Sequence, residues 1–181
     1  MVYEFLATGF EDTEALAPVD ILRRGGVEVK TVSVMNSKEV TSANGVTLKT
    51  DLLFSEINNF DDVDLMFMPG GMPGSVNLNL HDGLRKVLVE QNKRGKRLAA
   101  ICAAPMVLGS IGVLEGKKAT CYPGFEKRLK GAEYTGDLCT VDGNITTAKG
   151  PAAAFIFGFT LLAQMSSEEN ALKIKKAMLF V

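Results

Sequence analysis

The sequence contains few of the residues on which most catalytic and metal sites depend. Among its 181 residues there is one histidine, His81, there is no tryptophan, and there are three cysteines. A mechanism that needs two histidines is therefore excluded, and a Cys–His dyad would have to use His81. The cysteines stand at positions 102, 121 and 139 without a CxxC element, which disfavours both a disulfide framework and a structural zinc site. Free thiols in a reducing compartment fit this pattern best, so we expect a cytoplasmic protein.

Long apolar runs and a charge of one sign are also missing. No apolar run reaches the roughly 18–20 residues that a membrane-spanning helix needs. The first fifteen residues have no basic region before their short apolar stretch, so a signal peptide is not expected. The formal net charge of −1 gives no general attraction for nucleic acid or for an anionic membrane. We expect a small molecule or a protein as the partner instead.

The chain does contain a regular alternation of predicted strands and helices. Strands are expected at 3–8, 27–35, 63–71, 97–102 and 118–122, and helices at 10–26, 82–95, 104–112, 151–165 and 166–179. Residues 46–54 should be extended outside the main sheet, and Asp142-Gly143 indicates a hairpin over 138–148. This alternation predicts an α/β fold with a mainly parallel sheet and helices on both faces. Because no linker or repeat interrupts it, we expect a single domain over 1–181.

Three loops of the predicted fold should meet at one end of the sheet. In parallel α/β sheets the ligand site lies outside the carboxyl ends of the strands, where this chain has residues 7–14, 69–74 and 102–105. Cys102 would end one strand directly before a helix, whose N–H groups and dipole lower the pKa of a thiol. Buried free cysteine is often only a core residue, so this segment alone leaves a nucleophile and a core residue equally open.

The other two loops offer partners for a thiol, although each has a simpler interpretation. The sequence "MPGGMPG" at 68–74 can present N–H groups as an oxyanion hole, or it can form an ordinary turn. The sequence "GFEDTEA" at 9–15 holds three acids at a helix start, where carboxylates usually only stabilise the dipole. His81 opens an amphipathic helix, which indicates a cap rather than a catalytic base. Cys121 and Cys139 are expected in the core.

Together these segments resemble the ThiJ/PfpI superfamily, in particular its DJ-one-like branch. The resemblance rests on "GFEDTEALAPVDILRRGGVEV" (9–29), "FMPGGMPGSVNL" (67–78), "AAICAAP" (99–105) and "KGP" (149–151), in the family's order and spacing. It covers nearly the whole chain. It implies a flavodoxin-like three-layer sandwich, as in class I glutamine amidotransferases, and a homodimer without cofactor or metal.

The resemblance also implies roles for individual residues. Cys102 matches the reactive cysteine and Glu14 the carboxylic acid that faces it, while Gly71 and Ala103 would donate backbone N–H groups. A thiolate and a carboxylate in contact cannot both ionise cheaply, so the two would share a proton. The helix terminus should then place the charge on sulfur and leave Glu14 neutral.

The pocket residues implied by the resemblance include two departures from the family pattern. Gly70, Tyr122 and Pro151 would line the substrate pocket. Tyr122 stands where many members have a histidine, and tyrosine is a poor base at neutral pH. Ala103 stands where the protease branch has a histidine, so a Cys–His peptidase is disfavoured.

Two functions are compatible with this predicted site, and both use Cys102. As an enzyme, the protein would act on reactive dicarbonyls such as methylglyoxal, or on their adducts with thiols and amines. This would be a glyoxalase III or deglycase-type reaction in which Glu14 moves the proton. As a redox-responsive protective protein of the chaperone type, it would use the oxidation of the same thiol. An intracellular cysteine peptidase is the third and least favoured interpretation.

Overall fold

A seven-stranded sheet forms the centre of the fold in the computed structural model, which describes residues 1–180. The strands run in the order β10-β11-β7-β6-β1-β2-β5. They are β1 (Val2–Leu6), β2 (Val29–Ser33), β5 (Leu52–Leu53), β6 (Leu65–Met68), β7 (Arg97–Ile101), β10 (Cys139–Asp142) and β11 (Ile145–Ala148). Only the β10–β11 pair of this sheet is antiparallel, so the predicted mainly parallel sheet is confirmed.

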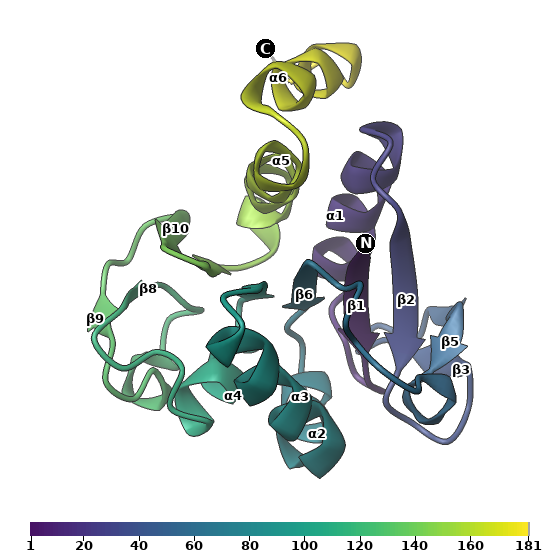
Figure 1. The fold of residues 1–181 in the computed structure, drawn as a ribbon, viewed down its shortest axis with the longest axis vertical. Helices are drawn as coiled ribbons and strands as arrows, with labels where there is room; N and C mark the ends of the chain where they lie inside the picture. The colour runs from purple at the N-terminus through teal and green to yellow at the C-terminus, as the bar shows by residue number, and fades with distance from the viewer. Residues whose placement is uncertain (181) are drawn as a thin grey trace.

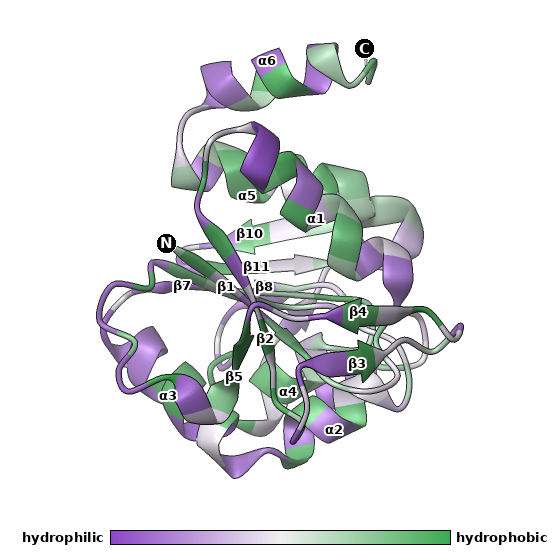
Figure 2. Ribbon diagram, turned by 90° about the vertical axis from the view of Figure 1, so that its right-hand side faces the viewer, coloured by the Kyte–Doolittle hydropathy of each residue, from purple (hydrophilic) through white to green (hydrophobic). Residues whose placement is uncertain are grey.

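Helices cover both faces of this sheet (Figures 1 and 2). One face carries α1 (Asp12–Arg24) and α5 (Ala154–Met165), and α6 (Glu168–Ala177) packs outside α5. The other face carries α2 (Gly74–Leu80), α3 (Asp82–Lys93) and α4 (Pro105–Ser110). The layers therefore stack as helix, sheet and helix, which confirms the flavodoxin-like α/β sandwich.

The strand sequences are apolar because the sheet is covered on both sides. Side chains of β1 alternate between the two faces: Phe5 packs in the core on the side of α3 and α4, whereas Val2 packs under α1 and α5. All five residues of β1 are buried, including the carboxyl group of Glu4. Burial of both strand faces explains why the predicted strands read as nearly continuous apolar runs.

Several element boundaries differ from the prediction. The first helix begins at Asp12 rather than residue 10, because Glu11 caps it, and Pro18 lies within the helix. The segment 46–54 was expected outside the main sheet, but only its first half lies outside that sheet. That half, β4 (Thr47–Lys49), pairs with β3 (Glu39–Thr41), whereas β5 is the edge strand of the main sheet.

The remaining elements lie in the second half of the chain. The strand expected at 118–122 is β8 (Lys118–Ala119), which pairs with β9 (Glu133–Tyr134) outside the main sheet. The hairpin expected at 138–148 is confirmed as β10–β11, and a short 3-10 helix (Pro151–Ala153) precedes α5. Within residues 1–180, no helix is both long enough and apolar enough to cross a membrane.

Candidate active site

Cys102 follows β7 directly and forms the sharp turn into α4. Its φ is 65°, in the left-handed region that residues with a side chain rarely adopt, and such strain is typical of nucleophile turns. Two main-chain hydrogen bonds hold the turn: the Cys102 N–H donates to the Ala148 carbonyl at 2.9 Å, and the Tyr122 N–H donates to the Cys102 carbonyl at 2.8 Å. Cys102 is only 8% exposed. Its sulfur is therefore held at the carboxyl ends of β7 and β11.

Glu14 faces Cys102 from the first turn of α1, where it is fully buried. The Glu14 N–H donates to the Glu11 carboxylate at 2.7 Å, which orients this turn of the helix. Its Oε2 atom accepts a hydrogen bond from the Gly70 N–H at 2.8 Å, and the carboxyl group lies close enough to the Cys102 thiol for each group to shift the pKa of the other. The three loops expected at the sheet edge thus meet at one pair of side chains.

The approach of these loops requires glycine at position 70. A Cβ atom there would lie 2.6 Å from the Cys102 Cβ and 2.7 Å from Glu14 Oε2, closer than any real side chain tolerates. The next residue, Gly71, has a φ of 88°. The main-chain N–H groups of Gly71 and Ala103 lie near the Cys102 sulfur and act to lower the pKa of its thiol. Negative charge that forms on this sulfur therefore meets two main-chain donors.

Burial raises the pKa of both members of the pair. It raises the pKa of Glu14 to about 7, although hydrogen bonds from Cys102 and Gly70 act in the opposite direction. Burial and then the charge of Glu14 raise the pKa of the Cys102 thiol to about 12. The lowered thiol pKa predicted from the sequence is therefore wrong. Burial and a neighbouring carboxylate outweigh two N–H donors and a helix of only six residues.

The pair therefore holds one negative charge and one proton between about pH 7 and about pH 12. The two groups titrate as a coupled pair, so this proton is shared between Glu14 and Cys102. A carboxylate with a pKa of about 7 is well matched to act as a general base at neutral pH. Glu14 can thus take the thiol proton as the sulfur attacks an electrophile.

A small cavity adjoins the turn that carries Cys102. Its volume is about 210 Å³, and its lining comprises Tyr122, Pro123, Leu138, Lys149, Gly150, Pro151, Ala152 and Ala153. Tyr122 and Pro151, two of the three residues predicted for a substrate pocket, line this cavity, whereas Gly70 packs between Cys102 and Glu14. Neither Cys102 nor Glu14 is part of the lining. Gly150 and Leu138 also line the cavity, and neither was predicted as a pocket residue. The "KGP" motif at 149–151 could have indicated Gly150, whereas no sequence motif indicated Leu138.

The other candidate residues lie away from the pair. His81 caps α3, where its Nδ1 accepts a hydrogen bond from the Leu84 N–H at 2.9 Å, as predicted. Cys121 is fully buried in the core on the α4 side, opposite to that of Cys102, and Cys139 is partly buried. All three thiols are free. Among residues 1–180, no group of three or more His, Cys, Asp or Glu side chains is placed to hold a metal ion.

Relatives of known sequence share most of this chain. It is 40% identical over 172 residues to Protein DJ-1 homolog B of Arabidopsis thaliana. The matched region covers 93% of this chain and 39% of that protein. The chain thus spans less than half the length of the Arabidopsis relatives that it matches. It is also 34% identical over 149 residues to a Pyrococcus horikoshii protein named a deglycase, covering 81% of this chain and 87% of that protein.

The fold and a family model lead to the same assignment. The structure matches that of oxidized DJ-1 from Toxoplasma gondii with a TM-score of 0.91 and 35% identity, over 98% of this chain and 97% of the other. A model described as "DJ-1/PfpI family" matches residues 1–164, which include Glu14, Cys102 and all three loops of the site. Motifs, fold and family model agree, and the chain belongs to the DJ-1/PfpI family.

Proposed function

We propose that this protein is an enzyme that acts through Cys102 on reactive dicarbonyls or their adducts, in a glyoxalase III or deglycase-type reaction. The observation that carries this proposal is the buried Cys102–Glu14 pair, in which a base with a pKa of about 7 contacts a thiol. The name of the Pyrococcus relative, a deglycase, supports it. The proposed steps need only these two side chains, two main-chain donors and water.

The first proposed step forms a hemithioacetal. The Cys102 sulfur attacks the aldehyde carbon of R–CO–CHO, and its proton passes to the Glu14 carboxylate. The S–C bond forms while the π electrons of the carbonyl group move to its oxygen. Protonated Glu14 then gives its proton to that oxygen. The N–H groups of Gly71 and Ala103, which lie near the sulfur, stabilise the thiolate that forms as the proton leaves, before its charge passes to the carbonyl oxygen.

The second proposed step moves a proton between neighbouring carbons. Glu14 removes the proton from the carbon bonded to sulfur and returns a proton to the adjacent carbon, through an enediol, which leaves a thioester of a 2-hydroxy acid. Water then cleaves the thioester, releases R–CHOH–COOH and restores the thiol. One carbon is oxidised and its neighbour is reduced, so the balance requires one water and no external oxidant or reductant.

The test is turnover of methylglyoxal to lactate by the purified protein. We expect Cys102→Ser to abolish turnover and Glu14→Gln to lower kcat by about 100-fold or more, the usual range for a lost general base. Cys139→Ser, which changes a thiol away from the site, is the matched control and should keep wild-type activity. Full turnover by Cys102→Ser would refute the proposal.

A second candidate function is redox-responsive protection, including chaperone activity. It is favoured by the description of the Toxoplasma relative as oxidized DJ-1 and by the two N–H donors at the Cys102 sulfur. The raised pKa of the Cys102 thiol argues against it, because thiolates oxidise faster than thiols. Mild peroxide followed by mass spectrometry separates the two functions. Oxidation of Cys139 with Cys102 unmodified would count against the redox function.

We also infer a cytoplasmic location and a homodimer. The location is supported by three free thiols, because unpaired cysteines are typical of reducing compartments. The dimer is supported by the apolar side chain of Leu16 on α1, which is 43% exposed.

A further inference from the structure

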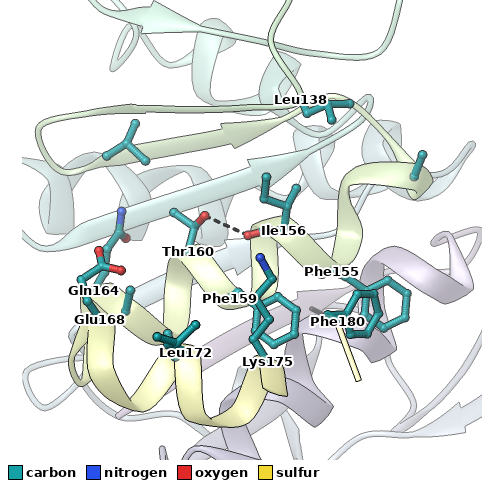
Figure 3. A pocket seen from close by; sticks show the side chains of 14 residues that line it. Leu138, Phe155, Ile156, Phe159, Thr160, Gln164, Glu168, Leu172, Lys175 and Phe180 are labelled. Carbon is teal, nitrogen blue, oxygen red and sulfur yellow. Dashed lines mark hydrogen bonds between the residues drawn. The ribbon is translucent and has the colours of Figure 1, made fainter. Parts of the chain in front are cut away.

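We propose that the apolar groove beside α6 binds medium-chain aliphatic monocarboxylates, with the carboxylate at Lys175 and the alkyl chain over α5. The groove has a volume of about 720 Å³ and lies between β10, α5 and α6 (Figure 3). Neither Cys102 nor Glu14 lines it, so this site is separate from the candidate active site. The inference goes beyond the proposed dicarbonyl activity and does not depend on it.

The groove gathers exposed apolar side chains in one place. Ten of its fourteen lining residues are apolar. Of the twelve large apolar side chains that are exposed within residues 1–180, five line this groove: Leu138, Val141, Ile156, Leu172 and Phe180. Apolar side chains exposed singly are ordinary, whereas a contiguous group in a hollow is typical of a binding surface. The volume also lies within the range of about 300–1,000 Å³ that is usual for small-molecule sites.

Two of the four polar side chains in the lining are already engaged within the protein. The Thr160 hydroxyl donates to the Ile156 carbonyl at 2.8 Å, which Figure 3 shows as a dashed line. The side-chain amide of Gln164 donates to the Thr146 hydroxyl at 3.0 Å. A polar group on a ligand must therefore be recognised by the other two side chains, and both of these are charged.

The two charged side chains, Glu168 and Lys175, lie at different points along α6. They are seven residues apart on one helix, so about 10 Å separates them along its axis. Figure 3 shows Glu168 and Gln164 at one end of the groove and Lys175 further along it. Within residues 1–180, neither charged group forms a salt bridge. Lys175 can thus attract one carboxylate, while Glu168 disfavours a second carboxylate at the far end.

Lys175 stands next to the most apolar part of the groove. The Phe180 N–H donates to the Lys175 carbonyl at 3.0 Å, which fixes Phe180 close to this end of α6. The Phe180 ring lies 4.6 Å from the Phe155 ring and 5.5 Å from the Phe159 ring, measured between centroids. An alkyl chain whose head group binds Lys175 therefore begins beside three phenyl rings. These charges and rings together favour an amphiphile with one anionic end.

Isothermal titration calorimetry with octanoate, decanoate and dodecanoate, each below its micelle concentration, tests the site. We expect the affinity to rise about four-fold for each added CH₂ group that the groove covers. Decanoate should bind about three-fold more tightly than decanol, because an exposed ion pair contributes modestly. Sebacate, which adds a second carboxylate to a chain of the same length, should bind more weakly than decanoate.

Variants of α6 separate the roles of charge and apolar surface. Lys175→Gln should lower the affinity for decanoate to that for decanol and leave decanol binding unchanged. Leu172→Asn keeps the side-chain size and should weaken both ligands about ten-fold. Lys173→Gln removes a charge from the same helix at a position that does not line the groove, so it is the matched control and should bind as the wild type does.

Three results would overturn the site. The first is an affinity that does not rise with chain length, or that is equal for decanoate and decanol. The second is binding that begins only at the micelle concentration, which would indicate a lipid surface as the partner. The third is a lower mass of Leu172→Asn than of the wild type in light scattering, because a second copy of the chain would then cover the groove.

Discussion

A single proton between Cys102 and Glu14 determines the chemistry of this molecule at the scale of residues. Burial raises the pKa of Glu14 to about 7, and the charge of Glu11 raises it as well. Glu11 has a second role, since its carboxylate accepts the Glu14 N–H at 2.7 Å. Glu11 is thus a positioning residue that adjusts both the orientation and the basicity of Glu14.

Activity should therefore depend on pH in a defined direction. We expect kcat/KM for methylglyoxal to rise as pH increases through about 7, because Glu14 must lose its own proton before it can accept one from Cys102. In Glu11→Gln this rise should move to lower pH, because the amide oxygen can still accept the Glu14 N–H but carries no charge that raises the pKa of Glu14.

The measurement is the pH profile of initial rates, with Glu28→Gln as the control. Glu28 precedes β2, at the opposite end of the strands from Cys102, so the profile of this variant should match that of the wild type. A purely structural effect of Glu11→Gln would lower the rate at every pH without moving the profile, and that result would contradict a tuning role.

At the scale of elements, β1 contains a feature that lowers stability. Glu4 lies within this central strand, fully buried, and neither of its carboxyl oxygens has a hydrogen-bond partner. Burial raises its pKa well above the ordinary value, partly offset by the charge of Arg23, while Asp51 raises it further. The folded state therefore holds Glu4 protonated at pH values where the unfolded chain has released that proton.

We expect Glu4→Gln to stabilise the protein at neutral and alkaline pH. Because the folded state binds one proton more than the unfolded state above the ordinary carboxyl pKa, wild-type stability falls as pH rises towards the raised pKa of Glu4. The glutamine amide has no titratable proton, so folding of this variant does not require a proton to be bound. The free energy of unfolding of Glu4→Gln should therefore exceed that of the wild type by at least about 1 kcal/mol near pH 8.

Urea denaturation at several pH values checks this prediction, with Glu39→Gln on the exposed edge of β3 as the control. The stability difference between Glu4→Gln and the wild type should widen as pH rises, whereas Glu39→Gln should show no such trend. A difference that is constant with pH would mean that Glu4 does not hold its proton in the folded state.

At the scale of the whole molecule, two apolar side chains are exposed on elements near the loop of Glu14. Leu16 on α1 is 43% exposed, and Val46 is exposed on the β3–β4 hairpin. The Asn44 amide donates to the Asp12 carboxylate at 2.8 Å and so ties the hairpin to the first turn of α1. We infer that this surface pairs with a second copy of the chain, which would cover apolar groups next to the loop of Glu14.

Light scattering coupled to size-exclusion chromatography tests the proposed homodimer. We expect the mass of two chains for the wild type and a shift towards one chain for Leu16→Asp, because a carboxylate would be desolvated in the interface. Leu80→Asp, which places the same charge on the far helix α2, should remain a dimer. A wild-type protein of single-chain mass would rule this interface out.

The sequence by itself determined the order of strands and helices and the three loops that meet at the site. Apolar periodicity, the Asp142-Gly143 turn and the cap of α3 by His81 are local properties, so they can be read without the tertiary structure. The family motifs added Glu14 as the partner of Cys102, and the structure brings the two into contact. The position of β5 at the edge of the main sheet could not be predicted, since strand pairing joins distant segments.

Only the tertiary structure decided how the site is charged and what surrounds it. From its place before a helix, Cys102 was expected to have a lowered pKa, but burial by the surrounding elements and the charge of Glu14 raise it. Burial of Glu4 and the apolar wall at Leu138 likewise depend on neighbours far away in the chain. Solvation and distance between remote segments set these properties, and neither is encoded in a local pattern of residues.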